Sequence, residues 1–158
     1  MTAREQRPAH DAHGRRFCLV AARFNEAYVR RLVDAALEVL GRSGAAVADL
    51  EVWWVPGSFE LPLACRWAAE SGRFDAVLAF GVLIRGETEH FRLVAETATQ
   101  GLMRVALDSS VPVLNGVLAV HDAEQAAART GGPLGNRGAD VALAAVQMAG
   151  LASQRSRP

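Results

Sequence analysis

The sequence predicts an α/β three-layer sandwich, in which a four-stranded parallel sheet is flanked by helices on both faces. Apolar runs of strand length alternate along the whole chain with segments whose apolar residues recur at helical spacing. The run "AVLAFGVLI" at residues 76–84 has no polar alternation, as expected of a central parallel strand covered on both faces. The strands therefore follow one another through right-handed crossovers.

The four predicted strands are apolar runs bounded by turn residues or by charge. "FCLVAA" forms a buried strand, and "LEVWWV" ends at Pro56 and Gly57. The predicted strands are residues 17–22, 50–55, 75–84 and 111–120.

Five predicted helices occupy the segments between and after these strands. In the first, Val29, Leu32, Val33, Ala36, Leu37 and Leu40 recur at helical spacing, and Gly44 follows as a stop. Pro62 lies near the start of the second, and Asp122 caps the fourth. The predicted helices are residues 26–43, 59–72, 89–110, 122–130 and 137–153, with "GGPLGN" as a tight turn before the last.

The chain has 158 residues, the usual size of one domain, and contains no internal repeat and no linker. Residues 1–16 are polar, and we expect a flexible N-terminal arm there. Residues 17–158 are expected to form a single domain.

Composition excludes several classes of partner. Lys plus Arg and Asp plus Glu are 17 each, which argues against a nucleic-acid or anionic-membrane surface. Residues 76–84 are too few to span a bilayer. Cys18 and Cys65 lie in apolar patterns without CxxC spacing, so we expect two reduced, buried thiols in a cytoplasmic protein.

Three of the strands end in unusual residues, and ligands bind beyond the carboxyl ends of parallel strands. Phe24 follows the first strand and is a candidate stacking face for a planar ring. Ser58 and Glu60 follow a Pro-Gly break and could hydrogen-bond a polyol. Alternatively, Ser58 caps the next helix and Glu60 decorates its first turn.

The third unusual strand end is "RGETEH" at residues 85–90. Gly86 permits a tight turn, and Thr88 can cap a helix whose first N–H groups point at any anion above the sheet. Glu87 and Glu89 would repel that anion, so a cation must compensate.

Arg129, just before the glycine-rich turn, and Arg85 are the candidate cations. His90, in the first helical turn, could transfer protons near neutral pH. The alternative is that the two glutamates only complement the helix dipole and His90 is solvated.

We expect no metal. Glu87 and His90 form a single ExxH pair, whereas a di-iron bundle needs two such pairs and further glutamates. The sequence also lacks GxxxxGK[ST], a GxGxxG after the first strand, and GxSxG.

Taken together, several stretches resemble the lumazine synthase family of riboflavin biosynthesis. They run in family order with family-like spacing. They are "RFN" (23–25), "VPGSFELP" (55–62), "FDAVLAFGVLIRGETEHF" (74–91), "VPVLNGVL" (111–118), "EQAAART" (124–130) and "GNRGADVALAAVQM" (135–148).

The resemblance implies a flavodoxin-like fold and a transferase that makes 6,7-dimethyl-8-ribityllumazine. In this family, 5-amino-6-ribitylamino-uracil condenses with 3,4-dihydroxy-2-butanone 4-phosphate, releasing phosphate and water without a redox or metal cofactor. It also implies a homopentamer with active sites between subunits. In some members pentamers pack into an icosahedral shell, and the short segment between Arg129 and Arg137 permits one here.

The resemblance also implies a role for each strand-end residue. His90 is the proton-transfer residue, and the phosphate lies at the backbone of Glu87 and Thr88, with Arg129 supplying charge. The implied ribitylaminouracil site comprises the stacking Phe24, the ribityl contacts Ser58 and Glu60, Phe59, the backbone of Val82, Leu83 and Ile84, and Asn115. Asn115 and Arg129 come from the neighbouring subunit in this implied arrangement.

Three positions depart from the common family pattern. Asn115 stands where many relatives carry Phe, Arg137 replaces a frequent Lys, and Ala119-Val120 replaces a Thr pair. Two other readings stay open: an archaeal-type riboflavin synthase, and a non-catalytic paralogue that binds flavin-like ligands or forms a shell.

Overall fold

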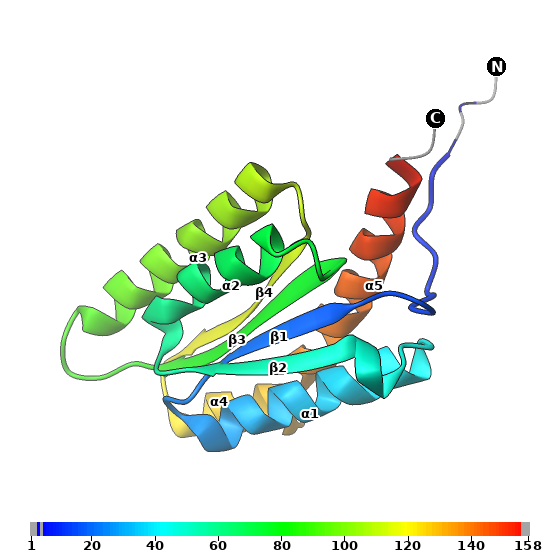
Figure 1. Cartoon of the computed structure of the whole chain (residues 1–158). Helices are drawn as coiled ribbons and strands as arrows, with labels where there is room; N and C mark the ends of the chain where they lie inside the picture. Colours follow the sequence, from blue (N-terminus) through cyan, green and yellow to red (C-terminus); the bar gives the residue numbers. More distant parts are fainter. Residues whose placement is uncertain (1–2, 4, 156–158) are drawn as a thin grey trace.

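The computed structural model describes residues 3 and 5–155. Its main sheet has the order β2-β1-β3-β4, and every neighbouring pair is parallel (Figure 1). The strands are β1 (Phe17–Ala22), β2 (Leu50–Val55), β3 (Ala76–Ile84) and β4 (Val113–Val120). This confirms the predicted four-stranded parallel sheet.

Helices cover both faces of the sheet, which confirms the three-layer, flavodoxin-like arrangement (Figure 1). Helices α2 and α3 cover one face, and α1, α4 and α5 cover the other. They are α1 (Glu26–Arg42), α2 (Leu61–Glu70), α3 (His90–Ser109), α4 (Ala123–Arg129) and α5 (Arg137–Arg155), with short turns η1 (Val47–Asp49) and η2 (Ser58–Glu60).

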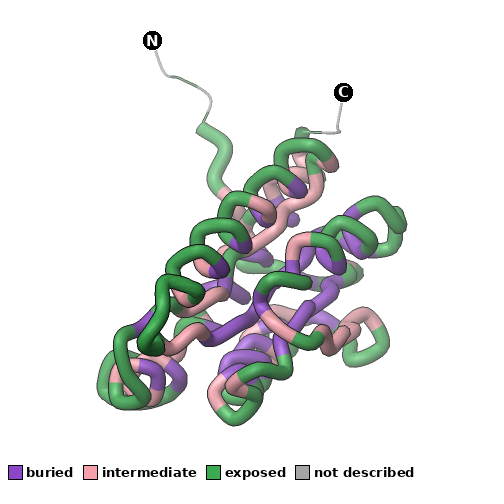
Figure 2. The backbone as a smooth tube through the Cα atoms, turned by 90° about the vertical axis from the view of Figure 1, so that its left-hand side faces the viewer, coloured by how far each residue is buried: buried purple, intermediate pink, exposed green. Residues whose placement is uncertain are grey.

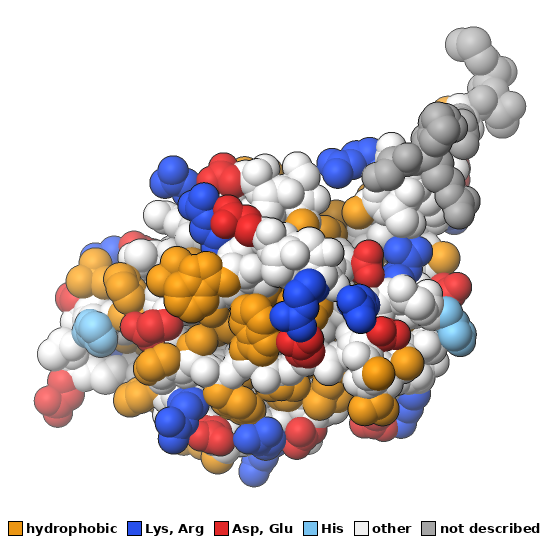
Figure 3. Space-filling view, in the orientation of Figure 1, with side chains coloured by type: hydrophobic (Ala, Val, Ile, Leu, Met, Phe, Trp, Pro, Cys, Tyr) orange, Lys and Arg blue, Asp and Glu red, His pale blue; other side chains and the backbone are white. Residues whose placement is uncertain are grey.

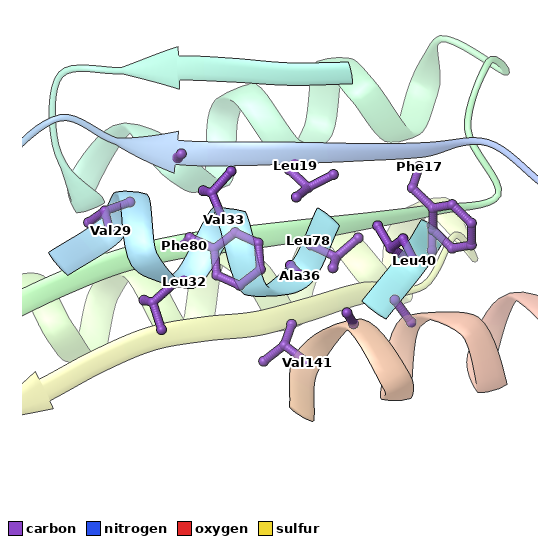
Figure 4. Packing of buried hydrophobic residues seen from close by; sticks show 14 of the residues in the cluster. Phe17, Leu19, Val29, Leu32, Val33, Ala36, Leu40, Leu78, Phe80 and Val141 are labelled. Atoms are coloured by element: carbon purple, nitrogen blue, oxygen red, sulfur yellow. The ribbon is translucent and has the colours of Figure 1, made fainter. Parts of the chain in front are cut away.

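Strand side chains alternate between two separate cores. Phe17, Leu19, Leu78 and Phe80 point toward α1 and α5 (Figure 4), whereas Cys18 and its alternate neighbours pack under α2 and α3. Viewed onto the end of the sheet, buried strands lie between helices whose outer surfaces are exposed (Figure 2).

Some element boundaries differ from the predicted ones. The predicted helix 59–72 is divided into η2 and α2, because Pro62 in the first turn of α2 lacks the N–H that a continuous helix would need. The segment "GGPLGN" belongs to a small antiparallel hairpin of β5 (Thr130–Gly132) and β6 (Gly135–Asn136). Asp122 caps α4 as predicted, accepting the Gln125 N–H at 2.8 Å.

The last part of the predicted arm contacts the domain. Ala12 is fully buried, and its N–H donates to the Ser43 carbonyl at 2.8 Å. The Arg15 guanidinium donates to the Ala149 carbonyl of α5 at 2.9 Å. Among the described residues, no helix is long and apolar enough to cross a membrane.

Candidate active site

A cavity of about 680 Å³ lies at the carboxyl ends of β1, β2 and β3. This volume falls in the range of small-molecule sites, roughly 300–1,000 Å³. The structure brings together here most of the residues that the sequence singled out: Phe24, Ser58, Phe59, Glu60, Leu83, Ile84, Thr88 and His90.

Two of the three phenylalanines that line the cavity are strongly exposed. Phe24 is 69% exposed and Phe59 is 62% exposed. The backbone of the first is fixed, since Arg23 N–H donates to the Val55 carbonyl at 2.8 Å and Phe24 N–H to the Pro56 carbonyl at 3.2 Å. A rigid backbone with an open ring suits stacking against a planar ligand.

Ser58 is one of the few buried polar residues, at 4% exposure. Its hydroxyl lies directly against Gly81 of β3, where a Cβ would collide with it. No side-chain hydrogen bond caps η2 or α2, so the capping alternative for Ser58 is wrong. Its side chain instead lies between η2 and the sheet, next to the exposed Glu60.

The loop after β3 ends at a helix N-terminus, as predicted. Helix α3 begins at His90, whose N–H donates to Thr88 Oγ1 over a long 3.4 Å. Glu89 and Glu96 each pair with Arg92 at 3.1 Å, and these hydrogen bonds raise the pKa of Arg92. The negative charge of Glu89 is therefore met by its own helix.

Four of the residues implied for the site are not among those that line the cavity: Val82, Glu87, Asn115 and Arg129. Val82 is buried in the core, and its carbonyl accepts a hydrogen bond from Asn25. Glu87 is exposed on the loop, and Asn115 lies on the edge strand β4, where its Oδ1 accepts the Val117 N–H at 3.0 Å.

Arg129 ends α4, which packs on the α1 and α5 face of the sheet, and its guanidinium donates to the Gln125 carbonyl at 3.2 Å. When His90 is neutral, Glu60 is therefore the one formally charged residue among the described residues that line the cavity. An anionic substrate needs a cation that this cavity does not itself contain.

Sequence reasoning missed part of the α3 wall of the cavity. Phe91, Leu93, Val94 and Thr97 line it together with His90. His90, Val94 and Thr97 follow the spacing i, i+4, i+7 and so share one helix face. This spacing in the sequence could have identified Val94 and Thr97 as part of the cavity wall. Among the described residues, no group of three or more His, Cys, Asp or Glu could hold a metal ion.

Comparison with known proteins matches the sequence of this chain to one family. The family model described as 6,7-dimethyl-8-ribityllumazine synthase matches residues 14–153. The chain belongs to the 6,7-dimethyl-8-ribityllumazine synthase family. The match to this family includes the whole sheet, every cavity residue, Asn115 and Arg129.

Curated lumazine synthases cover nearly the same region. The protein of that name from Halorhodospira halophila is 50% identical over 88% of this chain and 89% of its own length. The one from Chlorobium phaeobacteroides is 46% identical over 90% of this chain and 92% of its own. The chloroplastic one from Arabidopsis thaliana is 44% identical over 87% of this chain and 61% of its own.

Proposed function

We propose that this chain is a transferase that condenses 5-amino-6-ribitylamino-uracil with 3,4-dihydroxy-2-butanone 4-phosphate to 6,7-dimethyl-8-ribityllumazine in riboflavin biosynthesis. The observation that carries the proposal is the cavity at the strand ends, which joins open aromatic rings, a carboxylate and His90 within a family of this name. The amine attacks the ketone, a Schiff base forms with loss of one water, phosphate leaves, and the ring closes with loss of a second water.

The pyrimidine substrate occupies the side of the cavity formed by η2 and the ends of β1 and β3. Phe24 stacks on its ring, as the 69% exposure of that side chain allows. Ser58, Phe59 and Glu60 contact the ribityl chain. The backbone of residues 82–84 reads the polar edge of the ring, and Asn115 of a neighbouring subunit closes the site.

The phosphorylated ketone occupies the side near the α3 N-terminus. The backbone N–H groups of Glu87 and Thr88 hold its phosphate, and Arg129 of the neighbouring subunit supplies the cation that the cavity lining lacks. His90 transfers protons during Schiff-base formation and ring closure, from the first residue of α3.

A homopentamer is the proposed working unit. Large apolar side chains stay exposed on the outer surfaces of the α2 and α3 layer, and Figure 3 shows hydrophobic side chains gathered over α2 and β2. The large exposed apolar side chains of α2 and α3 are Leu63, Trp67, Leu93, Met103 and Leu107. The short β5–β6 hairpin between Arg129 and Arg137 leaves an icosahedral shell of pentamers sterically permitted. Light scattering on the purified protein distinguishes monomer, pentamer and shell.

The two free cysteines, Cys18 and Cys65, suit a reducing compartment, and we propose the cytoplasm. The Arabidopsis thaliana relative is named as chloroplastic, so fractionation of the source cells is the direct test.

The deciding experiment mixes both substrates with the protein and follows lumazine absorbance and fluorescence, with each substrate omitted in turn as a control. Lumazine formed at a rate proportional to enzyme concentration supports the proposal. Pyrimidine binding without product indicates a non-catalytic paralogue, and conversion of added lumazine to riboflavin indicates a riboflavin synthase. Either of these two outcomes overturns the proposal.

A further inference from the structure

Asn25 links β1 to α1 with an uncommon backbone conformation. It has φ 57° and ψ 39°, in the left-handed region, and among the described non-glycine residues only Ser110 shares a positive φ. Asn adopts this region more readily than most residues. Its carbonyl accepts the Tyr28 N–H at 3.0 Å and the Val29 N–H at 3.2 Å, which starts helix α1.

The side chain of Asn25 makes a second connection, to β3. Its Nδ2 donates to the Val82 carbonyl at 2.7 Å, in a partly buried position. The pairing of β1 with β3 ends at Ala21 and Phe80, so Val82 lies two residues beyond the last pair. The amide of Asn25 therefore supplies a donor to β3 where the β1 ladder has stopped.

This hydrogen bond joins two walls of the cavity. Phe24 precedes Asn25 in the chain, and Leu83 and Ile84 follow Val82; all three line the cavity. The backbone N–H groups of Arg23 and Phe24 hold the turn to the end of β2 alone. Among the described residues, the Asn25 amide supplies the one hydrogen bond that ties the turn at residues 23–25 to β3.

We propose that Asn25 is a positioning residue for the pyrimidine substrate, because its amide sets the spacing between the Phe24 ring and the backbone of residues 83 and 84. This inference rests on the proposed function. It also divides the roles within β3: Val82 acts by binding Asn25, and Leu83 and Ile84, which line the cavity, face the polar edge of the ring. The phosphorylated ketone binds at another segment, residues 87–88, so its binding should not depend on this hydrogen bond.

Two variants separate the amide from the backbone. Asn25→Gly keeps the left-handed conformation and removes the donor. Asn25→Asp keeps the size of the side chain but turns a carboxylate toward a carbonyl. Ser110→Gly is the matched control, since Ser110 also has φ 57° but lies at the C-terminus of α3 and is not among the residues that line the cavity.

We expect Asn25→Gly to raise the KM for the pyrimidine roughly 3- to 10-fold, the loss of one partly buried hydrogen bond. The KM for the phosphorylated ketone should stay at the wild-type value, and Ser110→Gly should change neither constant. Asn25→Asp should raise the KM for the pyrimidine further than Asn25→Gly does. This increase should shrink as the pH falls, because a protonated carboxyl donates to the Val82 carbonyl as the amide does. A merely structural residue would not produce this split between substrates or this pH profile.

A wild-type KM for the pyrimidine in a folded Asn25→Gly variant overturns the proposal, as does an equal rise in both constants. If Asn25→Gly does not fold, a loss in Asn25→Asp that is the same at every pH overturns it. Assaying the wild-type enzyme alongside distinguishes failure of the proposed function from failure of the role of Asn25. If the wild type makes no lumazine, the proposed function is wrong and the role of Asn25 with it. If the wild type turns over and the Asn25→Gly variant has an unchanged KM for the pyrimidine, only the role of Asn25 is wrong.

Discussion

The two faces of the sheet differ in how fully a single chain covers their apolar side chains. On one face, α1, α4 and α5 cover Phe17, Leu19 and Phe80, and the helices approach so closely that a Cβ on Gly138 would collide with the Leu32 carbonyl. On the other face, α2 and α3 cover a second core but leave large apolar side chains outward, among them Trp67 at 59% exposure. Large exposed apolar patches on a protein surface mark sites of protein–protein interaction.

The difference indicates that one face is nearly complete within a single chain, where Leu143 and Met148 of α5 are 38% and 43% exposed, and that the other needs a second chain. The cavity lies on the incomplete side, against α3, whereas Arg129 lies on the complete side. In the proposed assembly, a subunit supplies Arg129 to a neighbour while its own cavity receives one. Each prediction below alters one of these two faces.

The largest effect is expected from Trp67→Glu. A carboxylate placed in a buried apolar interface costs several kcal/mol, so the assembly should dissociate while each chain stays folded. Because the proposed site is shared between subunits, activity should fall by roughly 100-fold or more. Light scattering and turnover are measured together, with Val47→Glu as control, since Val47 is 88% exposed on η1, outside the α2 and α3 layer. Full activity from a monomeric Trp67→Glu would contradict the shared site.

Arg129→Ala tests the cation on the complete face. A charge-assisted phosphate contact is worth roughly 1.5–3 kcal/mol, so the KM for the phosphorylated ketone should rise roughly 10- to 150-fold. The KM for the pyrimidine should change little. The opposite pattern in steady-state kinetics would show that Arg129 does not hold the phosphate.

His90→Ala tests the cavity on the incomplete face. General acid–base catalysis contributes roughly 100- to 10,000-fold, but proximity of two reactive substrates also drives this condensation, so we expect a fall in turnover of about 100-fold or less. The exposed position of His90 predicts an unchanged melting temperature. An unchanged rate would remove His90 from the mechanism.

His90→Ala and Arg129→Ala, used together, also test directly whether the site is shared between subunits. Refolding His90→Ala together with Arg129→Ala should recover part of the activity, because some interfaces then combine the native His90 of one chain with the native Arg129 of another. Separately refolded variants, mixed afterwards, are the control. Recovery in neither sample would show that both residues act within one chain.

Gly138→Ala tests the packing of the complete face. The added methyl group would meet the Leu32 backbone, which cannot rotate away, and overpacking of this kind costs roughly 1–3 kcal/mol. Gly41→Ala is the matched control, because Gly41 lies in α1 with no atom near the added Cβ, and should stabilise the fold by about 0.5–1 kcal/mol. Denaturant unfolding measures both, and equal effects would show that the close approach of α1 and α5 is unimportant.

Periodicity was sufficient to predict the sheet and its helices, because buried strands and amphipathic helices leave different spacings of apolar residues. It defined the outer face of α2 by Arg66 and Glu70, but it could not predict that large apolar side chains would stay exposed there. Leu63 and Trp67 lie on that same face at helical spacing, and their apolar character alone suggests burial like that of Leu61 and Cys65, which are fully covered.

Features that depend on distant contacts also escaped prediction. The bond of Asn25 to Val82 spans 57 positions, and Ala12, a single apolar residue among polar ones, has no spacing that would reveal its burial. The candidate site was easier, because its residues cluster at strand ends, where topology alone brings them together. The hairpin β5–β6 has strands too short to show an alternating pattern.

The last prediction concerns the core beneath α2. Burial, with a lesser contribution from the Glu51 carboxylate, raises the pKa of the Cys18 thiol from 9.0 to about 12, and burial raises the pKa of Cys65 as well. Above pH 9 the unfolded thiols ionise while the folded ones stay neutral, so stability should fall by about 1.4 kcal/mol per thiol for each pH unit, for Cys18 until about pH 12. The sequence has no lysine and one tyrosine, so few other groups titrate in this window.

Denaturant unfolding at fixed protein concentration should show this slope in the wild type and a flatter one in the Cys18→Ala/Cys65→Ala variant, whatever the absolute stability of that variant. Equal slopes would mean that the core under α2 admits water, and that the incomplete face is open inside as well as outside.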